Sequence, residues 1–133
     1  MKRWKNICLE NYKPYSLENS QYASKKQKKK ARAFYKKYGF RYEETWNLDH
    51  TIACFVLPRL AYFREHMHGT PNDFIDFDEN MQIIGEHSDE WAATIDKMIN
   101  SFELIASEKD IGHDKEIQEG LELFGKYFRS LWD

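Results

Sequence analysis

The sequence predicts an all-α protein, a compact bundle of about four main helices with a proline-kinked central helix. Three observations support this fold class. Apolar side chains recur at steps of three and four residues in several segments, which is the period of an α-helix. Residues that favour helix starts precede these segments, and turn-forming residues separate them. With 133 residues the chain is of a size for one domain, so a single helical domain over residues 1–133 is expected.

Residues 44–66, the most apolar stretch of the chain, predict the central helix. Thr45 or Asn47 would cap its start through a side-chain oxygen. Pro58 has no N–H to donate and its ring crowds the preceding turn, so the helix is expected to kink there, or to stop near Val56 and begin again. The apolar residues expected to share one helical face are Leu48, Ile52, Phe55, Val56, Leu60, Phe63 and Met67.

A lysine-rich helix is predicted before it, starting at Ser16 or Ser20 and ending at Gly39. Lysines this dense repel one another, so they indicate an anionic partner. Nucleic acid, a phosphorylated small molecule or the acidic half of the same protein would serve. Base-reading residues at helical spacing are missing, so sequence-specific DNA readout is not expected. The residues proposed to bind nucleic acid or another anion are Lys25, Lys26, Lys28, Lys29, Lys30 and Arg32.

Two more helices are predicted in the second half of the chain, one starting at Ser88 and one at Asp114. Apolar residues recur at steps of four and three along both, which is typical of helices packed side by side. Gly120 and Gly125 interrupt the last helix at a cost of about 1 kcal/mol each. Close approach of a neighbouring helix would explain them. Residues 1–15 are expected to form an arm that packs on the body or on a neighbouring chain.

The segment between the central helix and Ser88 is rich in acids and turn-forming residues. Asp76, Asp78 and Asn80 have the spacing of calcium ligands, but Met81 stands where a calcium loop requires glycine. A calcium loop is therefore excluded. We expect an acidic loop with room for one short helix, placed to meet the lysine-rich helix.

Charge is strongly segregated along the chain. Residues 1–42 hold thirteen Lys and Arg against two acids, whereas residues 43–133 hold seven against twenty. The basic half favours an anionic partner, and the alternative is that the two halves attract each other within one fold or between subunits. No segment has the continuous apolar length of a membrane span, and the two cysteines form no disulfide framework. A reducing cytoplasm and no membrane partner are expected.

Four residues of the central segment have the composition of a nucleotide pocket. Aromatic faces would stack on a base, a guanidinium would bind phosphate or carboxylate, and a carboxylate would accept from a base edge or a ribose hydroxyl. The same composition fits a corner of the core that holds an Arg–Asp pair. The predicted ligand-binding residues are Trp46, Asp49, Arg59 and Tyr62.

Metal chemistry has less support. Carboxylates of Asp49, Glu86, Asp89 and Glu90 could together hold Mg²⁺ as in helical nucleotide pyrophosphohydrolases, but the repeated E-x-x-E pattern of those enzymes is missing. A zinc site would need about four converging ligands, and the sequence has no C-x-x-C. We expect no catalytic residues, no resident metal and no cofactor, and a binding protein rather than an enzyme.

Three blocks of the sequence resemble a family of small bacteriophage and prophage proteins: YGFRYEETWNLDHTIACFVLPRL, DEWAATIDKMINSFE and IQEGLELFGKYFRSLWD. The corresponding family patterns are TWxLDxTIAxF followed by LPRL, then EWxxxIDKMIxxFE, then EGLxLFxKYF. The resemblance covers about the last 95 residues of this chain. It implies a phage or prophage origin and, with it, the cytoplasm of a bacterial host, but it implies no reaction.

These observations together predict a non-enzymatic binding protein that sequesters or recognises an anionic, nucleotide-type signal in the host cytoplasm, with anti-defence as the natural use. Three alternatives are kept open. The first is nucleic-acid binding through the helix Lys25–Lys37, and the second is the magnesium-dependent pyrophosphohydrolase. The third is a protein–protein inhibitor or assembly factor. A host protein is a possible partner, and a homo-oligomer is expected because the basic and acidic halves would pair between subunits.

Overall fold

The computed structural model describes residues 17–133, and the predicted arm 1–15 lies outside them. Within these described residues, four α-helices dominate: α2 (Lys25–Tyr38), α3 (Leu48–His66), α4 (Ser88–Ala106) and α5 (Asp114–Tyr127). Short 3-10 helices η1 (Leu17–Asn19), η2 (Tyr42–Thr45), η3 (Asn72–Phe74) and η4 (Phe128–Ser130) connect them, with strands β1 (Ile75–Phe77) and β2 (Ile83–Glu86). The predicted all-α class with four main helices is confirmed.

The core lies where α4 packs against both α3 and α5. Trp91, Ile95 and Met98 of α4 are almost completely buried, as their helical spacing predicts. Tyr127 of α5 and Phe74 of η3 close one end of the core around the Trp91 ring. The buried apolar side chains are Ala53, Cys54, Leu57, Leu60, Ala61, Trp91, Ile95, Met98, Ile99, Phe102 and Ala106.

Helix α3 contains Pro58 in its interior and runs unbroken from Leu48 to His66. The alternative that the helix stops near Val56 and begins again is therefore wrong. Proline offers no N–H to the carbonyl of Cys54, one turn earlier. The next residue, Arg59, donates from Nη1 to the Phe55 carbonyl at 2.8 Å.

The apolar residues of α3 do not share one face, which corrects the sequence interpretation. Leu60 is buried against α4, and Val56 and Phe63 pack partly buried beside it. Leu48 and Ile52, like Phe55, are about half exposed. At 100° per residue, Ala53 and Leu57 lie at the centre of the buried face, which also includes the small side chains of Cys54 and Ala61. The outer face of α3 therefore carries apolar side chains that the bundle does not use.

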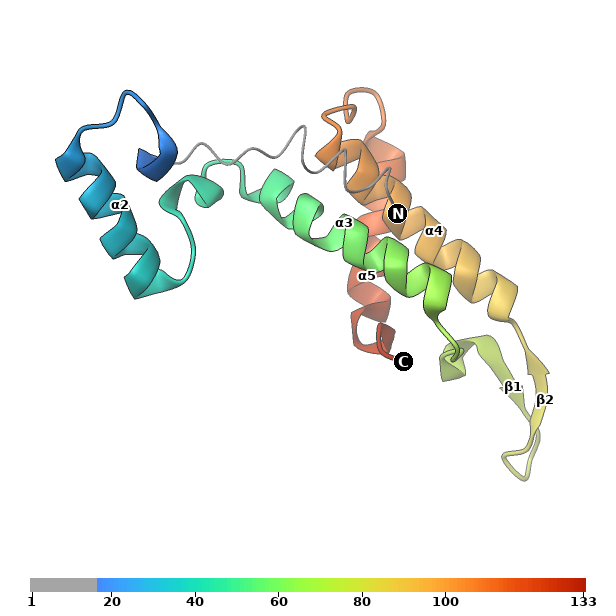
Figure 1. Ribbon diagram of the computed structural model, residues 1–133. Helices are drawn as coiled ribbons and strands as arrows, with labels where there is room; N and C mark the ends of the chain where they lie inside the picture. The colour runs from blue at the N-terminus through green and yellow to red at the C-terminus, as the bar shows by residue number, and fades with distance from the viewer. Residues whose placement is uncertain (1–16) are drawn as a thin grey trace.

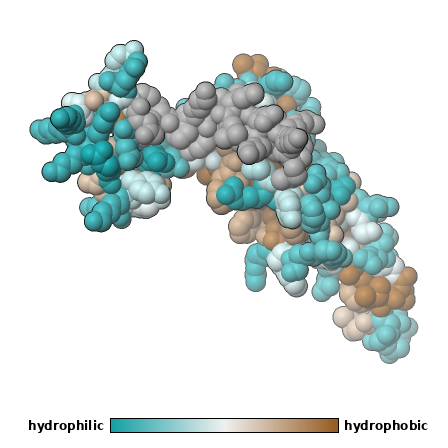
Figure 2. Space-filling view, viewed as in Figure 1, coloured by the Kyte–Doolittle hydropathy of each residue, from teal (hydrophilic) through white to brown (hydrophobic). Residues whose placement is uncertain are grey.

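The acidic segment after α3 forms η3 and an antiparallel hairpin in place of the predicted loop. Ile75 pairs with Glu86 and Asp76 with Gly85, and a bulge follows. Asp78 Oδ1 accepts from the backbone N–H groups of Asn80 and Gln82, which closes the turn. The hairpin extends beyond the bundle (Figure 1), and its apolar side chains are conspicuous in brown at the lower right of Figure 2.

Helix α2 packs on η1 and η2 and lies apart from the three-helix bundle, at the opposite end of the molecule from the hairpin (Figure 1). Ser24 caps its start and forms a reciprocal capping box with Gln27. The predicted starts at Ser16 or Ser20 are therefore wrong by several residues. Gly39 ends the helix in the left-handed conformation (φ 79°), as predicted. No helix of residues 17–133 has the length and apolar character needed to cross a membrane.

Candidate anion-binding surface

The four residues predicted to form a nucleotide pocket all lie on the outside of the molecule. Asp49 is in the first turn of α3 and Arg59 is ten residues further along, which is about 15 Å at 1.5 Å per residue. The Arg59 guanidinium lies over the Phe55 ring, 3.8 Å from its centroid. Because Asp49 and Arg59 are exposed and apart, the alternative of a core corner with an Arg–Asp pair is wrong.

The two aromatic residues of the predicted nucleotide pocket, Trp46 and Tyr62, contact different rings. The Trp46 ring meets the Tyr42 ring edge-on at 6.1 Å, before α3 begins. The Tyr62 ring stacks on His66 at 3.9 Å, near the end of α3. One end of α3 thus holds Trp46 and Asp49 and the other half holds Arg59 and Tyr62. Within one chain the structure does not bring the four side chains together.

The carboxylates considered for magnesium are also separated. Asp49 lies in the first turn of α3. Glu86 ends β2, and Asp89 and Glu90 lie in the first turn of α4, which runs antiparallel to α3 (Figure 1). Glu86 instead accepts from the Thr70 hydroxyl at 2.6 Å. Over residues 17–133, no group of three or more His, Cys, Asp or Glu side chains could hold a metal ion.

The cationic face of α2 is the most strongly charged surface of the described chain. The helix has eight Lys and Arg residues in fourteen positions and no acid. Placed at 100° per residue, they cover roughly 200° of the helix surface. None of them forms an ion pair with a carboxylate of residues 17–133. We define the cationic face as Lys25, Lys26, Lys28, Lys29, Lys30, Arg32, Lys36 and Lys37.

The opposite side of α2 is fixed by an aromatic cluster. The Phe34 ring packs against Tyr38 at 4.5 Å, against Phe40 at 5.7 Å and against Tyr42 at 5.8 Å. Phe34 is half-buried, whereas Tyr35 and Tyr38 remain largely exposed beside the lysines. This cluster holds α2 on η2. Most of the cationic face lies on the other side of the helix, whereas Lys30 borders the cavity beside η1 and η2.

A cavity of about 530 Å³ lies between η1, α2 and η2. Phe34 and Tyr42 supply apolar surface, and Lys30 and Arg41 supply positive charge. The Nε atom of Arg41 is buried and has no hydrogen-bond partner among residues 17–133, although its guanidinium lies over the Tyr35 ring at 5.1 Å. Glu18 and Glu43 also line the cavity, so its wall carries both signs of charge. The sequence interpretation missed this cavity, because its lining comes from three separate elements, η1, α2 and η2, that only the fold brings together.

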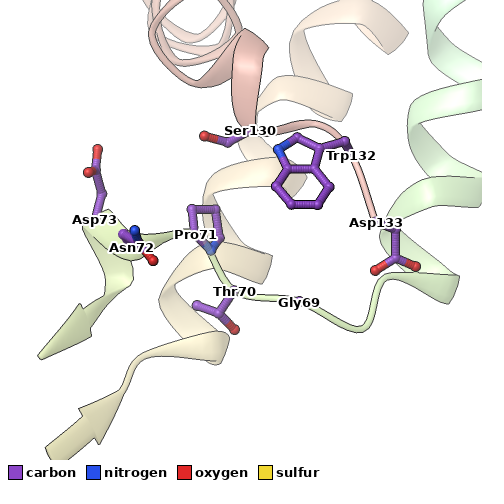
Figure 3. A pocket seen from close by; sticks show the side chains of 8 residues that line it. All are labelled: Gly69, Thr70, Pro71, Asn72, Asp73, Ser130, Trp132 and Asp133. Atoms are coloured by element: carbon purple, nitrogen blue, oxygen red, sulfur yellow. The ribbon is translucent and has the colours of Figure 1, made fainter. Parts of the chain in front are cut away.

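A second hollow of about 390 Å³ lies beside the turn 69–73 and the end of the described chain (Figure 3). Trp132 and Ser130 line one side, and Thr70 and Asn72 the other. Asp133 accepts from His68 through both its backbone N–H and its ring, each at 2.9 Å. These hydrogen bonds lower the pKa of Asp133 below its ordinary value. The hollow contains no exposed cation, so it adds nothing to the anion-binding surface.

Two acids of the bundle form ion pairs with cations of the same bundle. Arg64 pairs with Asp96 at 3.0 Å, and Lys97 pairs with Glu119 at 2.6 Å. In the part of the chain that the structure describes, α2 packs mainly on η1 and η2, and none of its cations pairs with an acid of the bundle.

Comparison with protein-family models, with curated proteins and with solved structures gives no match. The resemblance to small phage and prophage proteins therefore stays a prediction.

Proposed function

We propose that the protein binds nucleic acid through the cationic face of α2, without reading the base sequence. The charge of α2 supports this proposal most strongly. This fourteen-residue helix has eight cationic side chains and no acid, and none of the cations forms an ion pair with a carboxylate of residues 17–133. Folding this helix brings like charges within one turn of one another, which is unfavourable. A polyanion relieves that repulsion and gains the entropy of the counterions it releases.

The geometry of α2 supports a nucleic acid more than a small anion at this surface. The helix is about 21 Å long, and duplex DNA carries one charge per about 1.7 Å of its axis, so several phosphates fit along it. Exposed Tyr35 and Tyr38 lie beside the lysines and offer rings on which unpaired bases can stack. The helix has one Arg and one Gln, and the Gln27 side chain is already used in the capping box, so its many lysines are expected to contact phosphates rather than base edges.

The test is fluorescence anisotropy with labelled single-stranded DNA, duplex DNA and RNA at low salt. The variant changes Lys25, Lys28 and Lys29 to Gln, which keeps helix propensity and removes three charges. The matched control changes Lys109, Lys115 and Lys126 to Gln, so the net charge falls equally. Binding that weakens at least tenfold in the first variant and little in the second supports the proposal. Equal weakening, or no binding by the wild type, refutes it.

A second candidate function is sequestration of a small anionic, nucleotide-type ligand, and the cavity beside α2 favours it. Its volume of about 530 Å³ falls in the range of small-molecule sites. The buried Nε of Arg41 lacks an acceptor, which a phosphate oxygen would supply, while Tyr42 and Phe34 offer apolar contact. In a phage-infected cell such a protein would remove a host signal from solution.

Calorimetry with nucleotides and cyclic dinucleotides tests this second function. Arg41→Gln removes the orphaned donor, and Arg59→Gln changes a guanidinium outside the cavity. Heat that disappears only with Arg41→Gln supports the cavity as the site. Heat that disappears only with Arg59→Gln favours the set predicted from sequence, Trp46, Asp49, Arg59 and Tyr62. No heat with any of these ligands rejects both.

A further inference from the structure

The outer face of α3 carries a continuous apolar stripe opposite the core. Leu48, Ile52 and Phe55 are 52%, 47% and 59% exposed, and the stripe continues through Arg59 to Tyr62, which is 54% exposed. The steps between them are four, three, four and three residues, the spacing of a coiled-coil seam. Single exposed apolar residues are ordinary, but a stripe of this length marks a surface for another helix.

Nothing in the described chain covers this stripe. Among residues 17–133, the main packing partners of α3 are α4 and η2, and α4 occupies the opposite face, through Ala53 and Leu57. The Arg59 guanidinium lies in the middle of the stripe, over the Phe55 ring. Asp49 flanks the stripe in the first turn and has no ion-pair partner among residues 17–133.

We propose that the outer face of α3 is where a second copy of this chain binds, in antiparallel orientation. Steps of four, three and four residues separate Leu48, Ile52, Phe55 and Arg59. This series of steps is the same in both chain directions. A two-fold axis between Ile52 and Phe55 therefore places Ile52 of each copy against Phe55 of the other. It also places Leu48 against the apolar stem of Arg59. Such a self-complementary patch is what a two-fold interface requires.

Charge complementarity favours a second copy of this chain as the partner, and it favours the antiparallel orientation of the two α3 helices. With that axis, Asp49 of one copy lies opposite position 58 of the other, one residue or about 1.5 Å along the helix from Arg59. The carboxylate of Asp49 then meets the Arg59 guanidinium, and symmetry makes two such pairs per dimer. A parallel arrangement would set Arg59 against Arg59 at the centre of the interface, which is repulsive. Asp49 and Arg59, which are apart within one chain, thus meet between two chains.

Sedimentation equilibrium over a range of concentrations tests this interface. The wild type is expected to be a dimer in equilibrium with monomer. Phe55→Glu should weaken association at least tenfold, because it places two carboxylates near the axis. Ile111→Glu, at an apolar position that is 92% exposed in the α4–α5 turn, is the matched control and should leave association unchanged. A wild type that stays monomeric at the highest soluble concentration overturns the proposal, as does a dimer insensitive to Phe55→Glu.

A charge exchange tests the orientation. Asp49→Arg alone and Arg59→Asp alone should each weaken the dimer, because each places like charges together. The double variant should restore association towards that of the wild type, since both pairs are rebuilt with the signs exchanged. Association that falls further in the double variant overturns the antiparallel register. Far-UV circular dichroism of each variant establishes that α3 remains folded.

Discussion

Gly120 of α5 lies directly against Ser101 of α4. A Cβ atom built at Gly120 would be 1.8 Å from the Ser101 hydroxyl oxygen and 2.5 Å from the Lys97 carbonyl oxygen. The completely buried Ser101 hydroxyl is within hydrogen-bond distance of the Glu116 and Ile117 carbonyl oxygens, at 2.9 and 3.1 Å. Glycine is therefore required where these two helices cross. Gly125 has no atom within 4 Å of such a Cβ, so the expectation of close approach is confirmed for Gly120 and wrong for Gly125.

This contrast predicts opposite outcomes for two alanine substitutions in one helix. Gly120→Ala should destabilise the protein by about 1–3 kcal/mol or more, because α4 and α5 must separate to admit the methyl group. Gly125→Ala should be neutral or stabilising by up to about 1 kcal/mol, because alanine favours the helix and meets no neighbour. Urea denaturation of both variants measures the difference. Equal effects would contradict the helix crossing described.

The two faces of α3 give a second prediction. Leu57 is completely buried against the core, whereas Leu48 is half exposed on the outer stripe. Leu57→Ala should therefore cost about 2–5 kcal/mol of stability by leaving a cavity. Leu48→Ala should cost clearly less when measured at concentrations where the chain is monomeric. Thermal and urea denaturation compare them, and a larger loss for Leu48→Ala would reverse the assignment of the faces.

The hairpin is attached to α4 through a pH-dependent contact. His87 Nε2 lies 2.8 Å from Asp76 Oδ2. This hydrogen bond, together with the charge of Asp76, raises the pKa of His87 above its ordinary value of 6.5. A raised pKa in the folded state means that the contact stabilises the hairpin fully below pH 6.5 and is lost as the pH rises through the raised value.

NMR titration of the His87 ring checks this prediction. The wild type should titrate above pH 6.5, and Asp76→Asn should lower the His87 pKa towards its ordinary value. Asp73→Asn, in the neighbouring 3-10 helix, is the control and should leave the titration unchanged. An unchanged His87 pKa in Asp76→Asn would show that the contact does not form in solution.

The helical architecture was predictable because α4 and α5 have strong three- and four-residue periodicity. The hairpin was not, because strands of three and four residues leave too few positions for an alternating pattern to stand out. The inward face of α3 was predicted only in part, because Leu60 and its neighbours contact the core whereas Leu48 and Ile52 do not. Its buried side includes Ala53, Cys54 and Ala61, small side chains that carry little hydrophobic signal, while larger ones such as Phe55 lie outside.

The candidate site was predictable only in part. The charge of α2 is a property of composition, so its cationic character follows from the sequence, but its separation from the acidic bundle depends on tertiary packing. The predicted pocket required a bend at Pro58 to bring Asp49 and Arg59 together. Because α3 is continuous through Pro58, the rise of the helix keeps them about 15 Å apart. Arg41, which lines the cavity, lies outside the segments whose apolar residues recur at helical spacing, so no sequence pattern indicated its role.

The most direct test of the central claim is the salt dependence of binding to duplex DNA. If the cationic face of α2 contacts phosphates, a plot of log K against log salt concentration should fall with a slope of about −0.9 for each phosphate neutralised. The variant with Lys25, Lys28 and Lys29 changed to Gln should reduce that slope by about two to three, and the Lys109, Lys115 and Lys126 variant should not. Identical slopes for all three proteins, or no binding at low salt, would contradict the claim.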